Sequence, residues 1–235
     1  MPGQIAHLST TDQEFTFAPA TRIQHSFVAR MEKRTLIWLA ERMPAWVQPD
    51  HLTILGFLSQ CLAGACYAWA SLHPRALLWG IVFLFLNWLG DSLDGTLARV
   101  RNRQRPRYGF YVDHITDSAG AFFLMGGMAL SGYVHPGIAF GMLVAFLLLS
   151  IEAYLATYTL GSFRLSYFKF GPTEIRILLA IGNLALLIRP AISLFGRRLL
   201  LFDVGGVIAI LGMSLMFVIT AARHTRQLYK EERFT

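Results

Sequence analysis

The sequence predicts an all-α integral membrane protein of six transmembrane helices, preceded by an amphipathic helix that lies in the membrane interface. Of its 235 residues, 54% are hydrophobic and only 15% are charged, and the mean hydropathy is +0.47. A soluble domain of this length carries more charge. The apolar residues also gather in runs that are long enough to cross a bilayer. We therefore expect one membrane-embedded domain over residues 1–235.

Six apolar segments separated by short polar connections define the expected spans. They are residues 52–72, 76–100, 110–133, 136–160, 172–194 and 200–222, which together make a six-helix bundle over 52–222. Before them, residues 25–43 carry apolar side chains such as Met31 and Leu36 at helical spacing among basic ones. This pattern predicts the interfacial helix. Residues 1–20 have no periodicity and no apolar signal-peptide core, so a flexible tail is expected there.

The distribution of Lys and Arg predicts which side of the membrane each loop faces. All but four of the 21 basic residues fall on the side of the two termini; the exceptions are Arg75, Arg189, Arg197 and Arg198. By the positive-inside rule, both termini and the loop 101–107 are cytoplasmic, in the inner membrane if the source is prokaryotic. The net charge of +7 is then a topology signal. It does not indicate nucleic-acid binding, because the charges flank the spans.

Four aspartates lie in the second and third spans, which are mainly apolar. Asp91 and Asp94 are three residues apart, and Asp113 and Asp117 are four apart, so each pair lies on one face of its helix. Ionised carboxylates are costly in hydrocarbon and repel one another, so their presence indicates a compensating cation. Ligand sets made only of oxygen favour Mg²⁺, Mn²⁺ or Ca²⁺ over zinc or copper. The sequence therefore predicts a divalent-metal site at the cytoplasmic end of these spans.

The spacing D-x-x-D-G-x-x-A-R, nine residues, then G-x-x-x-D-x-x-x-D resembles the signature of the CDP-alcohol phosphotransferase (CDP-alcohol phosphatidyltransferase) family. Its fixed positions are filled by Asp91, Asp94, Gly95, Ala98, Arg99, Gly109, Asp113 and Asp117. The resemblance implies transfer of a phospho-alcohol group, most often phosphatidyl from CDP-diacylglycerol, to an acceptor alcohol in phospholipid synthesis. It further implies release of CMP, two Mg²⁺ or Mn²⁺ ions, a CDP-linked lipid donor, a small alcohol or lipid acceptor, and a homodimer.

The resemblance also implies a role for each aspartate of the signature. All four, Asp91, Asp94, Asp113 and Asp117, would hold metal. The last of them, Asp117, would in addition act as the catalytic base that takes the proton of the attacking hydroxyl.

The donor contacts are expected around the second aspartate. They are Asp94, Gly95, Ala98, Arg99 and Gly109, joined by Asp50 and Thr53 from the run Pro49-Asp50-His51-Leu52-Thr53, which resembles the family's P-N-x-x-T. A side chain at Gly95 would obstruct the nucleotide, and Arg99 supplies a fixed charge for phosphate. Close helix packing in membranes also uses small residues such as Gly95 and Ala98. Asp50, which stands where Asn is usual, is also a good helix N-cap.

The acceptor site is less clearly marked. Its candidates are Glu152, Arg164, Lys169 and Arg176. The three basic residues fall between the fourth and fifth expected spans, where they suit either a phosphorylated acceptor or lipid headgroups. Glu152 is a carboxylate within a span and is a site candidate on that ground. It is equally suited to a hydrogen bond with a polar group on a neighbouring helix, such as Tyr154 or Asn87.

Two other functions account for part of the pattern. Membrane prenyltransferases also hold Mg²⁺-diphosphate with aspartate-rich helices, but their signature is D-x-x-D-x-x-x-D and position 98 here is Ala98. A divalent-cation transporter or a metal-binding membrane scaffold would explain the carboxylates. It would leave Gly95, Ala98 and Arg99 unexplained.

Overall fold

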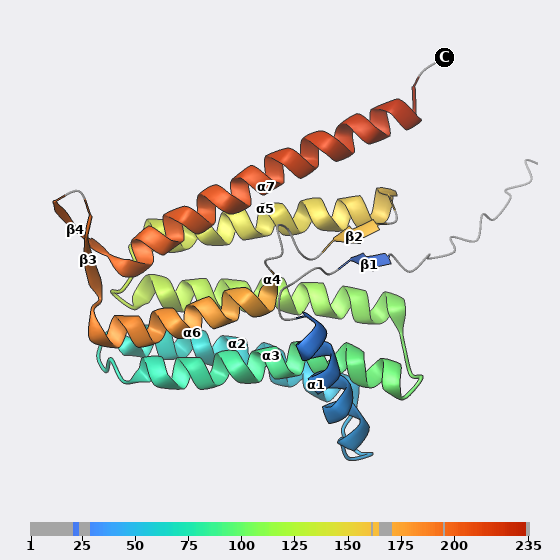
Figure 1. Ribbon diagram of the computed structural model, residues 1–235, viewed down its shortest axis with the longest axis horizontal. Coiled ribbons are helices and arrows are strands. Elements are labelled where there is room, and N and C mark those ends of the chain that lie inside the picture. The colour runs from blue at the N-terminus through green and yellow to red at the C-terminus, as the bar shows by residue number, and fades with distance from the viewer. Residues whose placement is uncertain (1–20, 24–28, 161, 165–170, 195, 234–235) are drawn as a thin grey trace, which may run out of the picture.

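The computed structural model describes residues 21–23, 29–160, 162–164, 171–194 and 196–233. Its helices are α1 (Ala29–Arg42), α2 (Pro49–Ala70), α3 (Ala76–Val100), α4 (Pro106–Leu130), α5 (Pro136–Leu160), α6 (Pro172–Ile188) and α7 (Leu201–Glu231). Its strands are β1 (Thr21–Ile23) parallel to β2 (Ser162–Arg164), and β3 (Ala191–Leu194) antiparallel to β4 (Arg197–Leu200). The described part of the chain is therefore mainly helical, as the sequence predicts (Figure 1).

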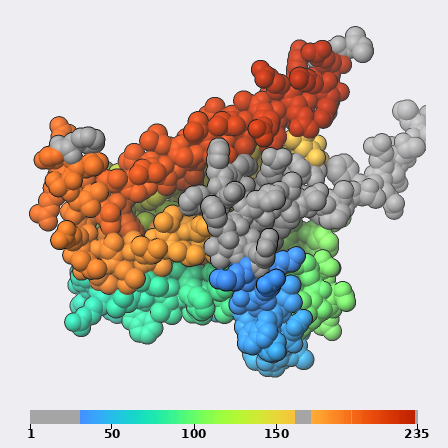
Figure 2. Space-filling model, in the orientation of Figure 1, coloured from blue at the N-terminus to red at the C-terminus, as the bar shows by residue number. Residues whose placement is uncertain are grey.

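The order in which the long helices pack against one another in space differs from their order along the chain. α2 contacts both α3 and α4, α4 contacts α5, and α5 contacts α7, while α6 lies against α3. α6 separates α7 from α3 on the face shown in Figure 2. A buried core is formed by side chains such as Tyr67, Leu77 and Leu84. Helices α2, α3 and α4 thus form a central unit, and the later helices are added around it.

Glycines allow the backbones of the central unit to touch. A Cβ atom on Gly90 of α3 would lie 2.5 Å from the carbonyl oxygen of Leu52, and one on Gly127 of α4 would lie 1.9 Å from that of Gly64. Both contacts are on α2, and no larger side chain fits at either position. Close approach through small residues is a common means of helix association in membranes. Because Gly90 directly precedes Asp91, the first contact also fixes where that aspartate stands.

The expected spans are confirmed in part. Six long helices follow the six segments, and four of them, α2, α3, α5 and α7, are long and apolar enough to cross a membrane. The helices α4 and α6 do not meet that criterion, and α6 has only 17 residues. The expected span 172–194 is wrong at its end, because Pro190 stops the helix at Ile188 and a β-hairpin follows.

The two ends of the chain also differ in detail from the expectation. The last helix continues to Glu231, beyond the expected end at residue 222. A helix, α1, covers residues 29–42 of the range 25–43, and its place in the membrane interface stays a prediction. Residues 24–28 and the expected tail 1–20 lie outside the described residues. α1 buries Leu36 against Leu93 and Leu97 of α3. This contact brings α1 to the end of α3 that carries the aspartates.

Candidate active site

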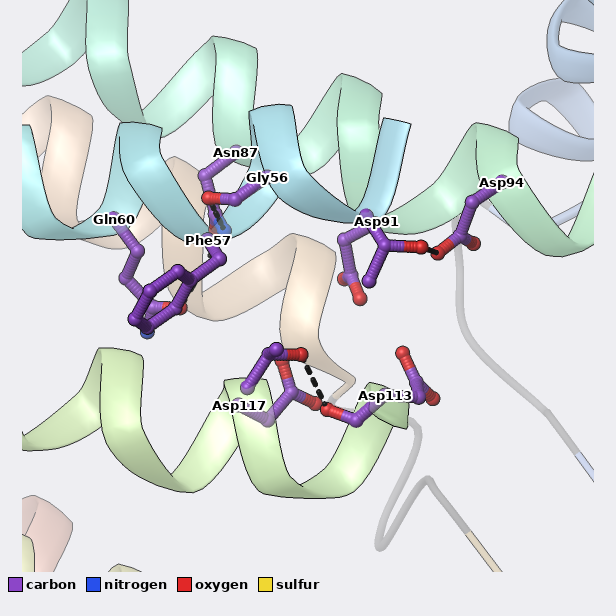
Figure 3. Close-up of a pocket in the computed structure, with 10 residues that line it drawn as sticks. Gly56, Phe57, Gln60, Asn87, Asp91, Asp94, Asp113 and Asp117 are labelled. Carbon is purple, nitrogen blue, oxygen red and sulfur yellow. Dashed lines mark hydrogen bonds between the residues drawn. The ribbon is translucent and has the colours of Figure 1, made fainter. Parts of the chain in front are cut away.

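Three of the four aspartates meet between α3 and α4. Asp91 on α3 and Asp113 and Asp117 on α4 each place a carboxylate oxygen within 4.8 Å of the others (Figure 3). The spacing of three and four residues explains why each pair faces inward. Asp94 lines the same pocket but stands outside this group of three.

Asp94 is held by two donors on its own side of the pocket. The hydroxyl of Thr53 on α2 donates to Asp94 Oδ2 over 2.7 Å, and the backbone N–H of Gly95 donates to Oδ1 over 2.5 Å. The Thr53 contact links α2 to α3 at the level of the site. It gives Thr53, expected as a donor contact, a direct role in orienting Asp94.

The pocket between the aspartates is suited to a metal ion. Its volume is about 10 Å³, which is close to the space that one water molecule or ion requires. The side chains of Thr53, Gln60, Asn87 and Thr116 line it together with the carboxylates. A pocket rich in carboxylate, amide and hydroxyl oxygen fits a hard divalent cation such as Mg²⁺ or Mn²⁺.

Arg176 on α6 is joined to this site. Its guanidinium donates from one terminal nitrogen to Asp91 Oδ2 and from Nε to Asn87 Oδ1, each over 2.7 Å. Asn87 in turn donates to the carbonyl of Gly56 over 3.0 Å. The sequence suggested Arg176 as an acceptor contact. In the structure its guanidinium holds and partly neutralises Asp91.

A larger cleft of about 730 Å³ leads to the aspartates. Every residue expected to contact the donor lines it, namely Asp50, Thr53, Asp94, Gly95, Ala98, Arg99 and Gly109. A Cβ atom on Gly95 would approach only a guanidinium nitrogen of Arg99, at 3.4 Å, and one on Gly109 would meet nothing within 4 Å. Helix packing therefore does not explain these two glycines. The open space beside them is available to a ligand.

Asp50 is placed at the rim of the cleft. Its carboxylate pairs with Arg105, whose guanidinium also stacks over the ring of Tyr108 at 4.1 Å. The N-cap of α2 is Gln48, so the alternative of Asp50 as N-cap is wrong. The Asp50–Arg105 pair instead ties the start of α2 to the connection between α3 and α4.

The other acceptor candidates do not gather at the aspartates. Glu152 on α5 is buried, and its Oε1 lies 2.5 Å from Nδ1 of His224 on α7. The alternative of a hydrogen bond to a polar group on a neighbouring helix is therefore confirmed, but the partner is His224 and neither Tyr154 nor Asn87. The side chain of Arg164 and the whole of Lys169 lie outside the described residues.

Sequence reasoning missed His114. Its ring is buried, lies 4.1 Å from the ring of Phe110 and 4.6 Å from that of Tyr154, and places Nδ1 3.4 Å from Asp113 Oδ2. It also lines the large cleft. A histidine directly after a predicted metal ligand, within an apolar span, is the signal that would have identified it.

The comparison with protein families fits this geometry. The model of the CDP-alcohol phosphatidyltransferase family matches residues 46–220, which include the whole aspartate site. The chain belongs to the CDP-alcohol phosphatidyltransferase family. Members of this family are transferases of phospholipid synthesis, and they use divalent metal ions.

A similar protein of the family is cholinephosphotransferase 1 of Gallus gallus. The two sequences are 30% identical over 148 residues, which is 60% of this chain and 43% of the relative. The chain thus spans less than half the length of that protein. Family membership and the four apolar helices together indicate an integral membrane protein. The prenyltransferase and transporter alternatives are set aside by the family match.

Proposed function

We propose that this protein is a metal-dependent phosphotransferase that moves a phospho-alcohol group from a CDP-alcohol to a second alcohol and releases CMP. The observation that carries the proposal is the convergence of Asp91, Asp113 and Asp117 at a cleft lined by every expected donor contact. An oxygen-lined site of this kind suits a diphosphate whose charge must be neutralised before attack. Family membership supports the same reaction class.

The residues present can hold the metal that this reaction needs. Asp91, Asp113 and Asp117 would be the main ligands, and Asp94 would complete the set from the other side of the pocket. Two Mg²⁺ or Mn²⁺ ions held there, as the family resemblance implies, would neutralise the charge of the diphosphate and of the leaving CMP. Arg176 keeps Asp91 oriented through its 2.7 Å contact, and Thr53 does the same for Asp94.

The protein itself positions the donor and removes a proton. Gly95 and Ala98 leave room beside α3 for the nucleotide, and Arg99 adds a fixed positive charge near the phosphates. The hydroxyl that attacks phosphorus must lose its proton as the bond forms. We assign this step to the carboxylate of Asp117, which would accept the proton while CMP departs.

The proposal leaves two donor classes for the assay to separate. A CDP-diacylglycerol donor would make the transferred group phosphatidyl, as the sequence resemblance implies. The similar protein of Gallus gallus is named a cholinephosphotransferase, which favours a CDP-amino-alcohol as the second candidate. With either donor, we propose that the acceptor enters from the membrane or the cytoplasm. We further propose that the site and both termini are cytoplasmic and that the enzyme is a homodimer.

The test is metal-dependent CMP release by the purified protein in lipid nanodiscs. CDP-diacylglycerol and CDP-choline are each supplied with a panel of acceptors, in Mg²⁺, in Mn²⁺ and in EDTA. We expect release that requires metal and is abolished by Asp113→Asn. The matched control is Asp203→Asn, because Asp203 accepts a hydrogen bond from the backbone N–H of His135 and does not line the cleft. Full activity of Asp113→Asn, or no CMP release from any donor, would overturn the proposal.

A further inference from the structure

A β-hairpin stands at the end of the helix bundle opposite the aspartates. It is formed by β3 and β4, and its base is closed by the backbone N–H of Leu201, which donates to the carbonyl of Pro190 over 3.0 Å. Figure 1 shows both strands lying across the direction of the long helices, with the turn standing clear of them. In a protein whose helices cross a membrane, a hairpin in this orientation lies along the membrane surface.

The length of α6 places the hairpin at the edge of the bilayer. The 17 residues of α6 span about 25 Å, whereas the hydrocarbon core is about 30 Å thick. Asn183 donates to the carbonyl of Leu77 in the first turn of α3 over 3.4 Å, so the end of α6 reaches the level at which α3 begins. The hairpin therefore starts in the interface between hydrocarbon and water, where the phosphates of lipid headgroups lie.

One face of the hairpin is apolar. Successive residues of a strand point to opposite faces, and the register pairs Ile192 with Leu199 and Leu194 with Arg197. These four side chains therefore share one face, which we call the leucine face. Its two leucines are 39% and 37% exposed. An apolar face that ends in an arginine suits the bilayer surface, because the stem of Arg can lie on lipid while its charge reaches the phosphates.

The charge at this end of the bundle is positive. Its arginines are all exposed, and none of them forms an ion pair within the described part of the chain; they are Arg75, Arg189, Arg197 and Arg198. Among the described residues of this end the acidic one is Asp203, which accepts a hydrogen bond from the backbone N–H of His135. The positive-inside rule does not account for arginines on the side opposite the aspartates. Anionic lipid headgroups are complementary to them.

We infer that the leucine face is a binding surface for anionic phospholipid in the leaflet opposite the aspartates. Leu194 and Leu199 lie against the acyl chains, and Arg197 pairs with a lipid phosphate. Arg198 lies on the other face of the hairpin and points away from the bilayer. This surface is separate from the aspartate site, so the inference does not depend on the proposed phosphotransfer.

The experiment measures which lipid lies next to the hairpin. The full chain, with Cys61 and Cys66 replaced by Ala, carries a fluorescent bimane label on Leu194→Cys and is placed in phosphatidylcholine nanodiscs. A small fraction of the lipid is brominated phosphatidylglycerol in one sample and brominated phosphatidylcholine in the other. The ratio of quenching by the anionic lipid to quenching by the neutral lipid reports the enrichment of anionic lipid at the leucine face. We expect a ratio of about 5 or more, the factor that one basic residue contributes near an anionic surface.

Arg197→Gln is the decisive variant, and Arg198→Gln is its matched control. We expect Arg197→Gln to lower the ratio about 5-fold, toward one, and Arg198→Gln to leave it at the value of the unsubstituted hairpin. Both arginines are exposed, so both variants should keep the unfolding temperature. A label on Ser193→Cys, which lies on the face of Arg198, should be quenched less by either lipid.

Several results would overturn the inference. Equal quenching by the two lipids, an unchanged ratio in Arg197→Gln or an equal loss in Arg198→Gln would show that Arg197 does not select anionic lipid. Stronger quenching at Ser193→Cys than at Leu194→Cys would place the other face on the bilayer. Absence of quenching at Leu194→Cys, with energy transfer between labels on two copies, would assign the leucine face to a second copy of the chain.

Discussion

Replacing Thr53 by Val tests whether the hydrogen bond that orients Asp94 is needed for turnover. Val has nearly the shape of Thr, so the change deletes the 2.7 Å bond from the Thr53 hydroxyl to Asp94 Oδ2 without opening a cavity. A hydrogen bond to a charged group is worth about 1.5–3 kcal/mol. If that free energy is lost at the transition state, kcat should fall about 10- to 150-fold.

The assay is CMP release at saturating donor over a series of Mg²⁺ concentrations. A misoriented Asp94 should also raise the Mg²⁺ concentration needed for half-maximal rate. Thr53→Ser keeps the hydroxyl and should restore most of the activity. Thr220→Val is the control, because the hydroxyl of Thr220 is buried and bonds only to carbonyls of its own helix. Wild-type kcat in Thr53→Val, or an equal loss of kcat in Thr53→Ser, would refute the reasoning.

Four further outcomes are expected. Asp117→Asn should lower the transfer rate by at least about 10²–10⁴-fold, the loss typical of a removed base, while equilibrium binding of the CDP donor persists. Gly95→Leu should raise the KM for the donor by roughly 10-fold or more, through steric overlap in the cleft, with an unchanged unfolding temperature, since the site has open space. A cysteine at exposed position Arg103 should react with membrane-impermeant maleimide only from the cytoplasmic side. His224→Ala should destabilise the folded protein by on the order of 3 kcal/mol, because it leaves the buried carboxylate of Glu152 without its partner, as measured by thermal unfolding in detergent.

Each of these outcomes can fail in its own way. Loss of donor binding in Asp117→Asn would show that the residue acts through metal and donor binding and is not needed as the base. An unchanged KM in Gly95→Leu would mean that the nucleotide does not pass this surface. Labelling of the Arg103→Cys protein from outside intact cells would show that the loop 101–107 is not cytoplasmic. An unchanged unfolding temperature in His224→Ala would show that the pair with Glu152 adds no stability.

The aspartate site could be anticipated because it depends on local geometry. The spacing of Asp91 from Asp94 and of Asp113 from Asp117 sets each pair on one helix face, and adjacent helices joined by a short loop bring the two faces together. The same local rules place most helix boundaries, since Pro49, Pro106 and others stand at the first turn.

Contacts between distant segments could not be anticipated in this way. Glu152 and His224 are 72 residues apart, and their pairing depends on α7 lying against α5, which no periodicity in either helix specifies. The contact of Arg176 with Asp91 likewise depends on α6 lying against α3. The hairpin of β3 and β4 was hidden for another reason. The residues of β3 are mainly apolar, so they extended the expected span 172–194, whereas most of β4 lay in the expected connection to the next span. Gly196, with a φ of +74°, makes the turn.

The glycine contacts of α2 have a consequence for how this protein can change over evolution. The aspartates, Thr53 and the touching backbones all lie within the continuous stretch 49–130, which is locked by contacts that admit no larger residue. Helices α5, α6 and α7 reach that stretch mainly through side chains, which are replaced far more easily than a backbone contact. Substitutions on α6, which lines the cleft with Pro172, Thr173 and Arg176, can therefore change the cleft without disturbing the backbone contacts that position the aspartates.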